Sequence, residues 1–170
     1  MSGRHTGRTD LPLTEAGEAK AVALGPRLAS LHFDEVYSSP LLRARRTAEL
    51  AGFAGAQISP LLREVDYGDY EGLTTRAIRE SKPGWELFRD GCPGGETPDQ
   101  IYSRAQAFIA EASRSAGSVL AFAHGHILRA IAAAWIESDI MVSAGLMLDV
   151  ATLSLLSQDE RRLISLWNAP

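Results

Sequence analysis

The chain has 170 residues, of which 45% are hydrophobic and 22% charged, and its formal net charge at pH 7 is −4. This composition indicates a globular protein with a sizeable core and excludes a disordered chain, and the negative charge argues against a general nucleic-acid binder. The one cysteine excludes an internal disulfide, and no apolar run is long enough to span a bilayer. We therefore expect one cytoplasmic domain over residues 1–170, with no membrane partner and no nucleic-acid partner.

The N-terminal part of the chain predicts a loop followed by a long helix. Residues 1–12 are polar and rich in turn-forming residues, with almost nothing to bury. Thr14 is typical of an N-cap, because its hydroxyl can accept a hydrogen bond from the first helical turn, and the helix is expected to run to about Leu31. Pro26 has no backbone N–H, so we expect it to kink or interrupt this helix near Gly25.

Further along the chain, strands alternate with helices, which is typical of a sheet layered between helices. Residues 118–122 form a short apolar run, expected to be a buried strand, and an apolar helix follows from about Ile127. The other predicted elements are strands over residues 34–38 and 56–59, helices over 40–51 (with Pro40 at its first position), 74–80 and 98–112, and a terminal pair of strands over 150–156 and 162–166. Residues 61–72 and 83–93 are expected to be irregular, with Trp85 and Phe88 packing beneath the second segment.

His124 stands between the strand at 118–122 and the apolar helix. Open α/β sheets bind ligands at the carboxyl ends of their strands, and the backbone N–H groups at a helix N-terminus favour anions. This position predicts a phosphate site, although a single histidine at a strand end is more often a hydrogen-bonded turn residue. A metal site is not predicted, because His124 and His126 have no third ligand at a suitable spacing.

Two other polar segments can reach the same strand ends. Arg43 lies in the first turn of a predicted helix and could present its guanidinium to a phosphate, whereas an isolated arginine there would be a surface residue. The loop at 61–72 carries several carboxylates, and one of them could protonate a leaving alkoxide if its surroundings raise its pKa. The pattern alone leaves the choice open among Glu64, Asp66, Asp69 and Glu71.

Together these segments resemble the histidine phosphatase superfamily, the phosphoglycerate-mutase-like phosphatases and mutases. The matching motifs follow the family's order along nearly the whole chain, at residues 9–17 (TDLPLTEAG), 38–48 (SSPLLRARRTA), 64–72 (EVDYGDYEG), 94–97 (GGET), 123–125 (AHG) and 166–168 (LWN). The resemblance implies an α/β fold, a three-layer α/β/α sandwich of the phosphoglycerate mutase-like type, and phosphoryl transfer through a phosphohistidine.

The resemblance also assigns roles to individual residues. In the family a histidine attacks phosphorus, arginines and a second histidine hold the phosphoryl oxygens, and an acid protonates the leaving group. Arg43 then corresponds to a phosphate-clamping arginine, His124 to the second histidine and Glu64 to the general acid. The positions that line the substrate pocket are Thr6, Gly7, Tyr67, Gly125 and His126. Fixed cations and donors suit the loose transition state of phosphoryl transfer, and no metal or other cofactor is expected.

The family's nucleophile lies in an Arg-His-Gly motif directly after a first strand, and this chain departs from that pattern. Arg4-His5-Thr6 follows only three residues and has threonine in place of glycine, which would limit backbone approach to a phosphate. We therefore expect the first strand and the nucleophile to be missing, with His5 as a loop residue near the pocket; the alternative is that His5 itself attacks. A sheet without its internal strand has exposed edges, so we expect reduced stability or homo-oligomer formation.

The leading interpretation is a phosphomonoesterase acting on small phosphorylated metabolites, and the loop at 6–10 favours sugar phosphates. A phosphoglycerate-mutase-type phosphotransferase is the less favoured reading, because the chain lacks the longer insertions of the glycolytic mutases. A second alternative is a phosphate-ligand-binding protein of the same fold without catalysis. A generic α/β interaction module would show no phosphate affinity at all.

Overall fold

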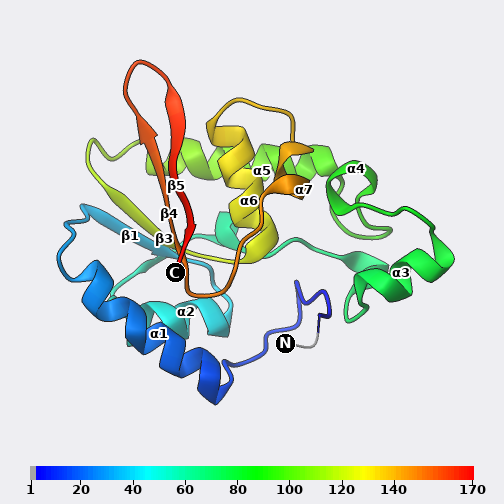
Figure 1. The fold of residues 1–170 in the computed structure, drawn as a ribbon, viewed down its shortest axis with the longest axis horizontal. Coiled ribbons are helices and arrows are strands. Elements are labelled where there is room, and N and C mark those ends of the chain that lie inside the picture. Colours follow the sequence, from blue (N-terminus) through cyan, green and yellow to red (C-terminus); the bar gives the residue numbers. More distant parts are fainter. Residues whose placement is uncertain (1–2) are drawn as a thin grey trace.

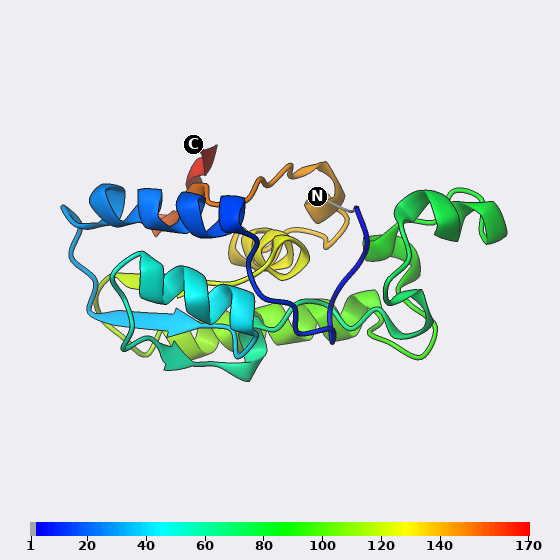
Figure 2. The ribbon, with the colours of Figure 1, turned by 90° about the horizontal axis from the view of Figure 1, so that it is seen from below.

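A computed structural model describes residues 3–170 and shows a parallel sheet with helices on both faces (Figure 1; Figure 2). The strand order in the sheet is β2 (Gln57–Ile58), β1 (Glu35–Ser38), β3 (Val119–Phe122). One face is covered by α1 (Glu15–Leu28) and α2 (Leu42–Leu50), and the other by α5 (Pro98–Ala112) and α6 (Gly125–Trp135). The expected three-layer α/β/α arrangement is confirmed.

Side chains on alternate sides of each strand build two hydrophobic clusters. Val36 and Phe122 face α1 and α2, where they pack with Leu24 and Leu28. Tyr37 faces the opposite way and joins the larger cluster between the sheet, α5 and α6. The sheet is therefore buried on both faces, as expected of a parallel sheet.

The pairing of β1 with β3 determines where the candidate site lies. The two strands are parallel and in register from Glu35 opposite Val119 to Ser38 opposite Phe122. Ser39 N–H donates to the Phe122 carbonyl at 2.9 Å, so the segments that leave both strands start side by side. The polar residues that follow each strand consequently meet at one edge.

The C-terminal strands form the expected antiparallel hairpin, longer than predicted, from β4 (Leu153–Gln158) and β5 (Arg162–Ala169). Leu153 packs against the cluster under α1 and α2, and Leu156 against the cluster under α5 and α6. Within residues 3–170, β3 pairs with β1 alone, and the segment before α1 contributes only an isolated bridge between Arg4 and Thr74. The expectation that the first strand of the family is missing stays a prediction.

Helix α1 begins as predicted but differs at its end. Thr14 is the N-cap, and its Oγ1 accepts from Gly17 N–H at 3.1 Å. The helix is not interrupted at Pro26 but continues to Leu28, three residues short of Leu31, and the expected kink near Gly25 stays a prediction. Pro26 lies in the last turn, where a missing hydrogen bond costs least, and burial of Leu28 holds that turn against the core.

The start of α2 also differs from the prediction. Pro40 precedes the N-cap, Leu41, whose backbone is extended, so Pro40 is not at the first helical position. The Asp10 carboxylate accepts from Leu42 N–H at 2.7 Å and caps the helix from the N-terminal loop. A cap supplied from outside the local sequence explains why the local pattern placed the start too early.

The segment between the sheet and α5 is a set of short turns. The described elements of this segment are 3₁₀ turns at Pro60–Leu62 and Gly68–Tyr70, α3 (Thr75–Ser81) and α4 (Leu87–Asp90). A further short helix, α7 (Val142–Gly145), follows α6. Helix α4 falls inside a segment expected to be irregular, but Trp85 and Phe88 are buried there as predicted. In the described part of the chain, no helix has the length and apolar character needed to cross a membrane.

Candidate active site

The carboxyl ends of β1 and β3 bring Arg43 and His124 into direct contact. Arg43 Nε donates to His124 Nδ1 at 3.2 Å, and His124 Nε2 lies 2.8 Å from Ser39 Oγ. Because Nδ1 accepts, Nε2 carries the proton of the neutral ring and donates to Ser39. Two residues predicted from separate motifs, 81 positions apart, thus form one cluster.

His124 is held in its neutral form. It is the N-cap residue of α6, and only 8% of its surface is exposed. Burial lowers its pKa to about 4; the positive charge of Arg43 adds to this effect, and the carboxylate of Glu64 opposes it. At neutral pH the ring is therefore uncharged, and its single N–H group, on Nε2, donates to Ser39 Oγ.

The guanidinium of Arg43 is fixed by backbone carbonyls of the N-terminal loop. Nη2 donates to the Thr6 carbonyl at 2.8 Å and Nη1 to the Thr9 carbonyl at 3.1 Å. Glu71 holds this loop in turn, since its carboxylate accepts from Gly7 N–H at 2.9 Å and from Thr9 N–H at 3.0 Å. The sequence pattern offers Glu71 only as a candidate acid. It does not predict this anchoring contact, because the contact joins residues more than 60 positions apart.

Gly7 lies where no other residue fits. A Cβ at this position would be 1.9 Å from the Val65 carbonyl oxygen, a distance that real structures do not allow. The N-terminal loop at Gly7 is therefore packed directly against the backbone of Val65, beside the cluster of Arg43 and His124.

Glu64 lies at the N-terminus of α6. One carboxylate oxygen accepts from His126 N–H at 3.2 Å and the other from Ile127 N–H at 3.1 Å. The expectation that this helix end offers its N–H groups to phosphate is therefore wrong for these two groups, which Glu64 occupies. Burial alone raises the pKa of Glu64, but the hydrogen bond and charge of His126 outweigh it and hold the pKa below its ordinary value.

Tyr67 and His126 form the wall beside Glu64. The Tyr67 hydroxyl lies 2.6 Å from His126 Nδ1, and burial raises the pKa of Tyr67 well above its usual value. His5 completes an aromatic group, with ring centroids 4.8 Å from Tyr67 and 5.6 Å from His126. Its Nε2 lies 3.2 Å from Thr75 Oγ1, and burial lowers its pKa to about 4. His5 is thus a loop residue near the pocket, on the His126 side.

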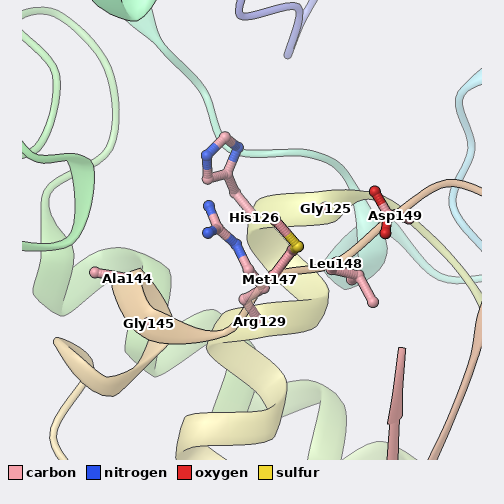
Figure 3. A pocket seen from close by; sticks show the side chains of 8 residues that line it. All are labelled: Gly125, His126, Arg129, Ala144, Gly145, Met147, Leu148 and Asp149. Carbon is pink, nitrogen blue, oxygen red and sulfur yellow. The ribbon is translucent and has the colours of Figure 1, made fainter. Parts of the chain in front are cut away.

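A pocket of about 500 Å³ opens next to this wall (Figure 3). It is lined by Gly125, His126, Arg129, Ala144, Gly145, Met147, Leu148 and Asp149. The predicted pocket residues Gly125 and His126 belong to it, whereas Thr6, Gly7 and Tyr67 lie around the neighbouring cluster. Arg129 was not predicted, although it is three positions after His126 and helical spacing places the two on one face. Over residues 3–170, no group of three His, Cys, Asp or Glu side chains could hold a metal ion.

The comparison with known families agrees with this architecture. The family model described as the histidine phosphatase superfamily (branch 1) matches residues 1–170. The chain belongs to this superfamily of phosphoglycerate-mutase-like enzymes, and its α/β fold is the fold of the family. The resemblance drawn from the motifs is confirmed.

Individual relatives are named phosphatases. An acid phosphatase of Mycobacterium tuberculosis is 39% identical over 157 residues, which cover 90% of this chain and 77% of that protein. Sedoheptulose 1,7-bisphosphatase of Saccharomyces cerevisiae is 38% identical over 79% of this chain, and the match spans only 62% of that relative's length.

Solved structures show the same fold. The structure of an open reading frame product from Mycobacterium tuberculosis superimposes with a TM-score of 0.94 at 36% identity, covering 98% of this chain and 89% of the other. A mycobacterial glucosyl-3-phosphoglycerate phosphatase in complex with VO3 gives a TM-score of 0.88 at 29% identity, covering 99% and 92%.

Proposed function

We propose that this protein is a phosphatase-type enzyme for monoesters of small phosphorylated metabolites, with sugar phosphates as the favoured substrates. The observation that carries the proposal is the contact of Arg43 with the neutral His124 at the adjoining ends of β1 and β3. A phosphoryl group placed there can take hydrogen bonds from the two guanidinium N–H groups that the contacts of Arg43 leave over, and from Nε2–H of His124 in exchange for Ser39 Oγ. The names of the relatives, acid phosphatase, sedoheptulose 1,7-bisphosphatase and glucosyl-3-phosphoglycerate phosphatase, support this substrate class.

Glu64 is proposed as the acid that protonates the leaving alkoxide. In the unliganded protein its pKa lies below the ordinary value, which is the wrong direction for an acid. A phosphate dianion bound near the carboxylate would disfavour the charged form and raise that pKa, so Glu64 would take up a proton from solvent when the substrate binds. Glu64 would then be protonated, and able to act as the acid, only when a phosphate group is bound.

The attacking histidine is proposed to be absent from this chain. Of the described histidines, His5 is the only candidate in the N-terminal loop, and its ring is held by Thr75 and Tyr67 on the His126 side. This geometry favours a second candidate function, a phosphate-ligand-binding protein that keeps Arg43 and His124 without turnover. The two functions share the same phosphate site and differ only in whether a bond to phosphorus forms.

Calorimetric titration with inorganic phosphate, followed by assays of phosphate release with EDTA present, tests the proposal on the chain as given. The R43A and H124A variants should lose phosphate affinity, and R45A, an exposed arginine of the same helix, should retain it. Binding that survives both R43A and H124A would overturn the proposed site. Release from aryl and sugar phosphates that H5A abolishes would identify His5 as the nucleophile; binding without release would favour the non-catalytic function.

A further inference from the structure

Arg129 has a setting unlike that of the other inward-facing arginines. It lies one helical turn after His126 on α6, and both side chains point into the 500 Å³ pocket (Figure 3). The ring of Phe88 stacks under the guanidinium, whose central carbon is 5.2 Å from the ring centroid. The position is therefore fixed by packing and by helical geometry before any ligand arrives.

The hydrogen-bonding capacity of Arg129 is almost unused. Its one hydrogen bond within the described residues is from Nη1 to the Leu146 carbonyl at 3.5 Å, at the limit of such contacts. No carboxylate among residues 3–170 lies within 4.0 Å of it, whereas Arg104, also mostly buried, forms an ion pair with Glu96 at 2.7 Å. Burial lowers the pKa of Arg129, and the charges of Glu64 and Glu86 oppose the shift from a longer distance. Burying a charged guanidinium in part, with N–H donors unused, costs free energy unless an anion pairs with it.

His126 offers a second donor to the same space. Its Nδ1 is engaged by the Tyr67 hydroxyl at 2.6 Å and lies 3.6 Å from a Glu64 oxygen, which leaves Nε2 for a ligand. Figure 3 shows the imidazole and the guanidinium next to each other on one side of the pocket, with Asp149 on the other side. Asp149 is held there by Asn168, whose Nδ2 donates to its carboxylate at 3.1 Å. The pocket thus has a cationic end and an acidic end.

We propose that His126 and Arg129 bind a second anionic group of the substrate, a phosphate or a carboxylate, while Asp149, on the other side of the pocket, accepts hydroxyl groups of the same ligand. This inference rests on the proposed function, because the first anion is the phosphoryl group held by Arg43 and His124. Gly125 and His126, which line the pocket, directly follow His124, the N-cap of α6, so the pocket adjoins the turn that carries the proposed phosphate site. The ligand class is therefore a polyhydroxylated phosphomonoester that carries a second acidic group.

The test compares matched ligands that differ only in that second group. Calorimetry on the whole chain would measure the Kd of fructose 6-phosphate against fructose 1,6-bisphosphate, and of sorbitol 6-phosphate against 6-phosphogluconate. Charge-assisted contacts with the guanidinium predict that the doubly anionic ligand binds about 10- to 100-fold more tightly in at least one pair. The pair that shows the preference identifies whether the second group is a phosphate or a carboxylate.

Variants of Arg129 assign the preference to this residue. R129Q should reduce it to less than about threefold, and R129K should keep part of it, because the charge remains but the two-donor fork is lost. R162Q is the matched control, since the Arg162 guanidinium also stacks on an aromatic ring, Trp135, at 4.9 Å, and does not line the pocket. Circular dichroism checks that each variant is folded. If R129Q does not fold, R129K alone tests whether Arg129 causes the preference.

The outcomes separate this inference from the proposed function. A wild-type protein that binds both members of each pair equally, in an Arg43-dependent way, would overturn the second subsite and leave the phosphate site standing. A preference that R129Q and R129K leave unchanged would also overturn it. Failure to bind any phosphate ester would overturn both proposals together.

Discussion

The two sides of the candidate site satisfy their charged groups in different ways. On the clamp side, which we define as Arg43, Glu64 and His124, Arg43 donates hydrogen bonds from three nitrogens and Glu64 accepts three backbone N–H groups. On the pocket side, defined by the residues that line the 500 Å³ pocket, the guanidinium of Arg129 donates a single hydrogen bond within residues 3–170, at 3.5 Å. One side is fully arranged before a ligand binds, and the other keeps its donors free.

This difference suits a family in which the phosphoryl group is constant and the rest of the substrate varies. A preorganised side holds the group that every substrate shares and lowers the cost of reaching the transition state. A side with free donors can take different acidic groups without a change in the fold. Substitutions that affect the clamp side should therefore disturb stability and phosphate binding strongly, and those on the pocket side should disturb both quantities weakly.

The largest effect is expected for Gly7→Ala. The added Cβ would overlap the Val65 carbonyl oxygen, so the loop that carries the acceptors of Arg43 must move. We expect phosphate affinity to fall about 10- to 100-fold, the penalty typical of a misplacement near 1 Å. Calorimetric titration measures it, with Gly55→Ala as the control because an added Cβ there meets nothing within 4 Å. Unchanged affinity in the Gly7 variant would show that the loop does not set the geometry of Arg43.

Glu71→Ala should have the next largest effect. The substitution removes the acceptor of Gly7 N–H and Thr9 N–H and leaves both groups without a partner at the base of the loop. We expect about 1–3 kcal/mol lower stability in urea unfolding and roughly tenfold weaker phosphate binding. Glu80→Ala, which removes an exposed carboxylate 3.9 Å from Arg76, should change neither quantity. Equal behaviour of the two variants would contradict the anchoring role of Glu71.

Protonation of Glu64 gives a third test of the clamp side. Sulfate mimics the phosphate dianion but does not titrate near neutral pH, so any pH dependence belongs to the protein. Because a bound dianion raises the pKa of Glu64, we expect sulfate affinity to rise several-fold as the pH falls from about 7 to about 5. Glu64→Gln should remove most of this slope in titrations across that range. A slope that is the same in both proteins would exclude Glu64 as the group that takes up the proton.

The neutral histidine of the clamp predicts a smaller effect on stability. The pKa of His124 is about 4 in the folded protein, below the ordinary value of 6.5. The unfolded chain therefore binds more protons between these values, so the free energy of unfolding decreases as the pH falls from 6.5 to about 4 and gains nothing from His124 above 6.5. Urea unfolding at several pH values should show a shallower decrease for His124→Gln. Identical slopes would mean that the ring is charged in the folded protein.

The smallest effect is expected for Met147→Ala on the pocket side. Met147 lines the pocket but is 72% exposed, so little apolar surface is lost on truncation. We expect a change in the free energy of unfolding below about 0.5 kcal/mol in urea titrations. A loss as large as that of Glu71→Ala would remove the contrast between the two sides.

The parts of the fold that the sequence predicted are those with strong local signals. Helix α5 has the predicted bounds because Thr97 and Gln100 form a capping box at its start, and Thr14 caps α1 by the same local chemistry. The end of α1 and the start of α2 differ from the prediction because core packing holds one helix end and a distant carboxylate caps the other. Local rules do not contain such long-range contacts.

The candidate site divides in the same way. Arg43, Glu64 and His124 were found from motifs and strand ends, and the structure places them together; their chemical roles stay proposals. The anchoring contacts of Glu71 and the position of Arg129 were missed because they depend on long-range surroundings: Glu71 holds the N-terminal loop, and Arg129 has no carboxylate within 4.0 Å among residues 3–170. Sequence patterns reveal residue types at spacings, but not which donors remain unused after folding.

Glu64 and His124 both lie at the N-terminal end of α6, so the proposed acid and the proposed phosphate-binding histidine depend on the same turn of backbone. The Glu64 carboxylate holds the N–H groups of His126 and Ile127, and His124 is the residue that begins the same helix. When Glu64 gains a proton, the positive N-terminal end of α6 loses the negative charge beside it, which changes the electrostatic environment of the turn that carries His124. If Glu64 and His124 have the proposed roles, proton delivery and phosphoryl binding share this turn, and we expect a substitution in the first turn of α6 to change both.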